Sequence, residues 1–367
     1  MPKQSKHQRR SKKRWRIPFC LGLALIALAL LWFARHFGFF RHGTPDSAPS
    51  TTAKSAIATN QNTYLAENAL GREAKQRGDT NQALAHFNES LRIQNNPEAH
   101  HSLGNLLLAQ KKTDDAIAHF RAALRLESRL PSTHNSLATA LSDQGKADEA
   151  IVHYQEAIRL QPETAAFHYN LAVVFADQKN DASASLEFAQ AERLGFESDD
   201  LALTFGKVLN RLGQFDEAEP HLRQALAAKT NSFEASFQFA LSLDRQNKHG
   251  EAIAAYGHAL TQMPDNPETL NHLALIYLTT PLTDLRSPKM ALLLATRACA
   301  AGNYDNPFHL DTLAQSCAAD HDLPAAIRWE QRAIESVPST GDKHFMEDLR
   351  ARLVLYQAQK SSLKTNK

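Results

Sequence analysis

One phrase recurs along this chain at a nearly constant interval. Residues 116–127 read AIAHFRAALRLE, and residues 150–161 read AIVHYQEAIRLQ, 34 residues later. The pattern places an alanine in eight segments, at Ala83, Ala116, Ala150, Ala184, Ala218, Ala252, Ala291 and Ala326. A period of this length is typical of stacked supersecondary units, each of which needs its neighbours to bury its apolar face.

Within each unit, small and large residues alternate as two closely packed helices require. Four residues after the alanine, on the same helix face, six units carry a large side chain: Phe87, Phe120, Tyr154, Phe188, Leu222 and Tyr256. About a dozen residues before the alanine comes another small residue: Gly71, Gly104, Ala138, Ala172, Gly206, Ala240 and Ala274. Gly145 and Gly213 fall between the two runs, where a helix ends in a left-handed residue.

These positions resemble the tetratricopeptide repeat, a 34-residue helix–turn–helix unit. The resemblance implies an all-α fold, a right-handed α-solenoid of about eight units over residues 63–340. The last two units depart from the pattern, because Ala295 and Glu330 stand at the large position. Unit seven also carries five extra residues, after which Ser287 and Pro288 are expected to cap and start its second helix.

A solenoid must cover the apolar face of its last unit. Residues 341–359 are predicted to form a capping helix, with a tail expected to be disordered at 360–367. One face of that helix would be apolar, with Phe345, Leu349, Leu353 and Tyr356. The other would carry the charges of Glu347, Asp348, Arg350 and Arg352.

The N-terminal region predicts a membrane anchor. Residues 1–16 hold eight of the 41 Lys and Arg residues and none of the 39 acidic ones, and residues 17–34 contain no charge. As a helix, that run spans about 27 Å, close to the thickness of the bilayer interior. A cleavable signal peptide is the alternative, but its apolar region is usually only about 7–15 residues long.

The charge distribution predicts the topology. Basic residues ahead of a single transmembrane helix keep that side in the cytoplasm. We therefore expect a basic cytoplasmic tail (1–16), an inner-membrane anchor (17–34) and a flexible, Ser- and Thr-rich stalk (35–62). The repeats would lie in the bacterial periplasm.

The sequence offers no sign of catalysis. It contains no GxGxxG, GxxxxGK[ST], GxSxG or HExxH motif and no cysteine quartet. Cys299 and Cys317 are expected to be buried thiols, although a disulfide between them is an alternative. Histidines recur at one position per helix, but neighbours along a stack lie roughly 8–10 Å apart. We therefore predict no enzyme activity, cofactor or metal, and no nucleic-acid partner, since the chain beyond residue 16 is net acidic.

The resemblance also implies a binding surface. In tetratricopeptide arrays, the first helices of the units line a concave groove that receives peptides or partner helices. Mapped onto this chain, the groove positions are His101, Asn105, Asn135, Thr139, Tyr169, Asn170, Val173, Leu203, Lys207, Phe237, Gln238, Leu241, Asn271, His272 and Leu275. Apolar side chains there would supply contact area, and amides would pair with a peptide backbone.

These features together predict a membrane-anchored adaptor that binds a protein or peptide partner during assembly of an envelope complex. Two alternatives stay open: a substrate-recruiting subunit for a separate enzyme such as a glycosyltransferase, and an assembly factor that faces the cytoplasm. Self-association through the repeats is a further alternative.

Overall fold

The computed structural model describes residues 51–229, 231–338 and 340–365, and these residues form helices joined by short loops, without a β-strand. Contacts divide the chain after Thr59, and the solenoid described below is the compact unit that follows. The predicted tail and anchor, residues 1–34, lie outside the described residues. None of the described helices is both long and apolar enough to cross a membrane.

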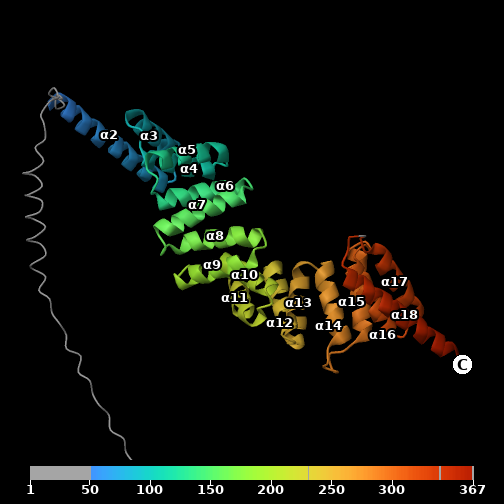
Figure 1. Cartoon of the computed structure of the whole chain (residues 1–367). Coiled ribbons are helices and arrows are strands. Elements are labelled where there is room, and N and C mark those ends of the chain that lie inside the picture. Colours follow the sequence, from blue (N-terminus) through green and yellow to red (C-terminus); the bar gives the residue numbers. More distant parts are fainter. Residues whose placement is uncertain (1–50, 230, 339, 366–367) are drawn as a thin grey trace, which may run out of the picture. The chain divides into compact units, whose positions relative to one another are not determined.

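Two helix series alternate along the chain (Figure 1). The first helices of the units are α2 (Thr51–Gln76), α4 (Pro97–Ala109), α6 (Pro131–Asp143), α8 (Ala165–Asp177), α10 (Asp199–Arg211), α12 (Phe233–Arg245), α14 (Pro267–Thr279) and α16 (Pro307–Ala319). The second helices are α3 (Thr80–Ile93), α5 (Thr113–Leu126), α7 (Ala147–Leu160), α9 (Asp181–Arg193), α11 (Phe215–Ala228), α13 (His249–Gln262), α15 (Pro288–Ala301) and α17 (Leu323–Ser336). From α4 onward, each first helix packs against its own second helix and each second helix against the next first helix, so the predicted all-α solenoid is confirmed.

The small and large positions interlock as the sequence predicts. All eight alanines of the repeated phrase are completely buried. The ring of Phe120 lies so close to Gly104 that a Cβ on the glycine would stand 2.5 Å from it, and Phe87 occupies Gly71 in the same way, at 2.7 Å. In unit five, Leu222 takes the place of the ring and lies 2.6 Å from where a Cβ of Gly206 would be. The absence of a side chain on the first helix therefore creates the space that the large residue fills.

Helix ends follow from the capping residues. Ser287 caps α15 by accepting a hydrogen bond from the backbone N–H of Met290, with Pro288 in the first turn, as predicted. Gly145 and Gly213 adopt the predicted left-handed conformation, with φ of 75° and 76°. Lys111 and Lys179 occupy the same turn position with φ of 62° and 60°, which costs a side-chain-bearing residue roughly 1–2 kcal/mol.

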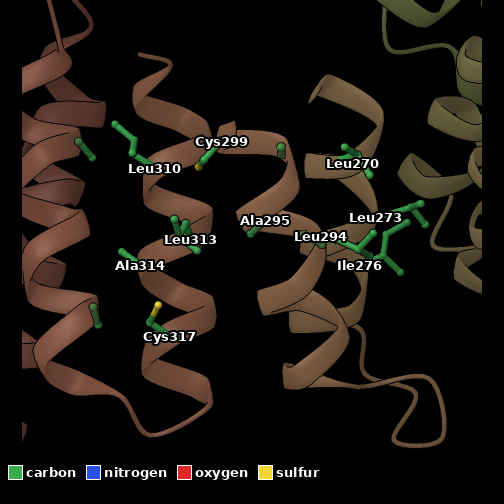
Figure 2. Close-up of a cluster of buried hydrophobic side chains, with 14 of the residues drawn as sticks. Leu270, Leu273, Ile276, Leu294, Ala295, Cys299, Leu310, Leu313, Ala314 and Cys317 are labelled. Atoms are coloured by element: carbon green, nitrogen blue, oxygen red, sulfur yellow. The ribbon is translucent and has the colours of Figure 1, made fainter. Parts of the chain in front are cut away.

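Figure 2 shows the core of the last units, built from α14, α15 and α16. Leu270, Leu273 and Ile276 meet Leu294, and Leu310 and Leu313 pack farther along the stack. Ala295, at the position that other units fill with an aromatic ring, is fully buried here too. Cys299 and Cys317 are free, buried thiols, as the sequence analysis favoured, and burial raises the pKa of Cys299 to about 12 and that of Cys317 to about 11.

The structure differs from the predicted element bounds at both ends of the array. Residues 51–62, assigned to the stalk, form the start of α2 because no glycine or proline interrupts the helix there. The last helix, α18 (Lys343–Thr365), extends past residue 359 into the predicted tail. It packs on α17, with Leu349 and Tyr356 buried.

Arg352 is not on the exposed face of α18, so its predicted placement was wrong. Its side chain reaches two buried acids, with Nε 2.9 Å from Asp311 and 3.4 Å from Glu330. Glu330 is completely buried, and within the described residues neither of its carboxyl oxygens receives a hydrogen bond. Burial, reinforced by the neighbouring Asp311, raises the pKa of Glu330 to about 8. Burial also raises the pKa of Asp311, so near neutral pH the two acids hold a shared proton and the arginine balances the remaining charge.

Candidate functional site: the first-helix surface

The fifteen residues predicted to line the groove all belong to the first helices α4, α6, α8, α10, α12 and α14. We call them the first-helix surface. Fourteen of them are partly exposed, which is the state expected of side chains that line a surface while packing at its base. The exception is Asn271, which is only 7% exposed, so a partner would not reach it without rearrangement.

At the N-terminal part of this surface, His101 joins two repeats. Its Nδ1 lies 3.0 Å from the hydroxyl of Thr133 on the next first helix, and its Nε2 lies 2.9 Å from the amide of Asn105. Burial lowers the pKa of His101, and the charge of Lys75 adds to the effect. The ring is therefore neutral near pH 7 and acts as a hydrogen-bonding group rather than as a cation.

Amide and hydroxyl groups continue the surface through units three and four. The side-chain amide of Asn170 donates to the amide oxygen of Asn135 at 3.0 Å, across the boundary between two repeats. Thr139 lies 2.9 Å from the hydroxyl of Tyr154. The Tyr169 ring stacks on Phe196 with centroids 4.5 Å apart, and Val173 packs beside it. Polar groups and apolar area thus alternate along the helices.

Unit five adds the one cation of the first-helix surface. Lys207 forms an ion pair of 2.9 Å with Glu234 from the next first helix. Gln238 accepts a hydrogen bond of 2.9 Å at its backbone oxygen from the buried Asn210. Because Glu234 already neutralises Lys207, the surface offers no cluster of free cations to hold a carboxylate.

Aromatic rings dominate units six and seven. Phe237 lies with its ring centroid 5.8 Å from His272, edge to face, and 5.9 Å from Tyr256. His272 stacks on Tyr256 at 5.6 Å, with the planes 11° apart. Burial is the main cause of a lowered pKa of His272, so this ring too is neutral near pH 7. Leu203, Leu241 and Leu275, each partly exposed, add aliphatic area along the same first-helix series.

The structure also brings together residues that the sequence analysis kept apart. Histidines contact each other across the two helices of one unit: His100 and His119 lie 2.9 Å apart at their Nδ1 atoms, and His134 and His153 lie 3.0 Å apart. The sequence argument compared neighbours along the stack and missed these pairs. A constant separation of 19 residues was the signal, and it also joins Glu67 to His86 and His168 to Glu187. The part of the chain that the structure describes contains no group of three metal-ligating side chains.

Comparisons with known proteins agree with this architecture. A tetratricopeptide repeat model matches residues 68–131 and 203–267, and a second TPR repeat model matches residues 139–179. A comparison with curated proteins found none that matches the sequence.

Solved structures share the fold. PilF of Pseudomonas aeruginosa is 21% identical, with 57% of this chain and 96% of PilF covered and a TM-score of 0.50. YrrB, described as a TPR protein with an unusual peptide-binding site, is 25% identical over 52% of this chain and 95% of its own, with a TM-score of 0.47. A TPR protein of Cytophaga hutchinsonii is 16% identical over 67% and 99%, with a TM-score of 0.48. The chain therefore carries tetratricopeptide repeats, arranged as an all-α solenoid.

Proposed function

We propose that this chain is a membrane-anchored scaffold that binds a protein or an extended peptide along its first-helix surface, in assembly of a bacterial envelope complex. The observation that carries the binding proposal is the composition of that surface. Partly exposed aromatic rings (Tyr169, Phe237, His272) alternate with amides that already bond across repeats (Asn135, Asn170). Apolar anchors supply area, while amide groups exchange their partners for a peptide backbone and so fix its direction.

The chemistry of the surface narrows the partner. His101 and His272 are neutral near pH 7, and Lys207 is paired with Glu234. A partner held mainly by charge would find little to bind. We therefore expect a segment with aromatic or aliphatic anchors, whose affinity depends weakly on salt.

Substitution of Phe237 tests the binding proposal. In affinity capture from detergent-solubilised membranes, Phe237→Ala is expected to reduce recovery of the partner about 30-fold, the effect of losing an anchor worth about 2 kcal/mol. The matched control is Val152→Ala on α7, since Val152 is 61% exposed on a second helix. Thermal melting must show that both variants are folded. Equal recovery with the two variants would contradict the proposal.

The anchor and the periplasmic location rest on the sequence alone, through the 18 uncharged residues at 17–34 and the basic residues ahead of them. A reporter that is active only in the periplasm, fused after Lys367, is expected to be active, and a reporter active only in the cytoplasm is expected to be silent. The reverse result would support the cytoplasm-facing alternative. Release of the full chain into the soluble fraction would exclude the anchor.

A further inference from the structure

Two successive units present the same pair of imidazoles. His100 on α4 faces His119 on α5, with Nδ1 atoms 2.9 Å apart and ring centroids 5.1 Å apart. His134 on α6 faces His153 on α7 with nearly the same values, 3.0 Å and 5.2 Å. Two nitrogen atoms at this separation share one proton as neutral rings, or they share a metal ion.

An oxygen acceptor holds the first histidine of each pair in one tautomer. His134 Nε2 lies 3.0 Å from the backbone oxygen of Ser128, and His100 Nε2 lies 2.8 Å from the side-chain oxygen of Asn95. Both oxygens are acceptors, so each Nε2 carries the hydrogen and each Nδ1 directs its lone pair at the second histidine. This is the arrangement that orients histidine ligands in metal sites, where the outer nitrogen donates to an oxygen.

The surroundings keep these rings available to a cation. Burial lowers the pKa of His100, His119 and His153, so near pH 7 their nitrogens are not occupied by a second proton. Each second histidine also has a carboxylate one helical turn before it, Asp115 before His119 and Glu149 before His153. Glu149 bonds Arg121 as well, at 2.6 Å, so the carboxylate of the first pair is the freer of the two.

The nitrogen separation selects among metals. With bonds of about 2.0 Å, two ligands at neighbouring corners of a square lie about 2.8 Å apart, whereas two tetrahedral ligands lie about 3.3 Å apart. The separations of 2.9 Å and 3.0 Å lie nearer the square arrangement, which Cu²⁺ prefers, and Cu²⁺ also binds nitrogen most strongly among the first-row divalent ions. We propose that each pair, His100 with His119 and His134 with His153, is a two-nitrogen binding site for Cu²⁺, with water completing the coordination.

This proposal is independent of the first-helix surface, because neither pair includes one of its fifteen residues. It also does not extend to the neighbouring units. Unit four places Glu187 opposite His168, and unit five has Ala202 where a partner for His221 would stand, 19 residues earlier. His221 thus provides an internal control at the same second-helix position.

Titration of the full chain with CuSO₄, followed by pulsed electron paramagnetic resonance, tests the sites. The expected result is about two Cu²⁺ ions per chain with the spectral signature of two coordinated imidazoles. His100→Gln is expected to abolish one such site, and the double variant His119→Gln/His153→Gln both, while His221→Gln retains both. Circular dichroism must show that the variants are helical.

Other outcomes would overturn the proposal. If the double variant gives the same two-imidazole signal as the unchanged chain, other residues bind the copper. If the unchanged chain gives no two-imidazole signal, the pairs are hydrogen-bonded histidines and nothing more.

Discussion

Replacing Phe120 with alanine is expected to destabilise the units around α4 and α5 by about 3–5 kcal/mol. Phe120 is completely buried, and its ring fills the space left open by Gly104. Alanine would leave a cavity that the two helices cannot close without moving. Because a solenoid is held together only by contacts between neighbours, the loss would fall on the units next to it.

Amide hydrogen exchange measures this effect locally. Exchange from α4 and α5 is expected to accelerate by about two to three orders of magnitude in Phe120→Ala, while α14 to α17 change little. Phe120→Leu reproduces the pairing of Leu222 with Gly206 in unit five and is expected to cost only about 1 kcal/mol. A Phe120→Ala chain with unchanged exchange in α4 and α5 would show that the interlock does not stabilise the array.

Replacing Arg352 with methionine is the second large change. Arg352 is the cation that faces the buried pair Asp311 and Glu330, and removing one partner of a buried ion pair typically costs about 3–5 kcal/mol. We expect the lower end, about 3 kcal/mol, because 28% of the Arg352 side chain is exposed and the two acids can take up a proton instead. Denaturant unfolding with a probe on α18 measures it. Arg350→Met, on an exposed site of the same helix, is the control and should lie within about 0.5 kcal/mol of the unchanged chain.

The same cluster gives the C-terminal units a pH dependence. The pKa of Glu330 rises from 4.5 to about 8 on folding, so the folded state binds the proton more tightly than the unfolded state does. Stability from this group is complete below about pH 4.5 and is lost as the pH rises towards 8. The other charged groups that face Glu330 are Asp311, Tyr356 and Arg352, and the raised pKa of Asp311 acts in the same direction.

Glu330→Leu separates this account from a general effect of alkali. The variant restores an apolar residue at the position where other units have Phe or Tyr, and it is expected to flatten the loss of stability between pH 5 and 8. An unchanged pH profile in Glu330→Leu would show that the dependence arises elsewhere.

Local periodicity explains how much of this fold the sequence predicts. The buried alanines, the rings that follow them and the cap at Ser287 depend on neighbours within one unit, so a 34-residue pattern contains them. Arg352 was misplaced because a helical wheel separates polar from apolar faces but does not show that a buried acid waits opposite. Glu330 stood out as a departure from the pattern, yet its partner lies on another helix.

The candidate site divides in the same way. Repeat register places fourteen residues of the first-helix surface at partly exposed positions, because all of them follow from one helix period. Asn271 is buried although its register matches, and the pairing of Lys207 with Glu234 depends on how two units are rotated against each other. The histidine pairs needed a comparison across the two helices of a unit, which a search along the stack does not make.

Photo-crosslinking in living cells tests the central claim most directly. A photoreactive phenylalanine analogue replaces Phe237 on the first-helix surface, and a control chain carries it at Gln155, an exposed residue of α7. Binding along the first helices predicts one dominant crosslinked partner from position 237 and none from position 155. Equal crosslinking at both positions, or crosslinks from position 237 only to a second copy of this chain, would contradict the account.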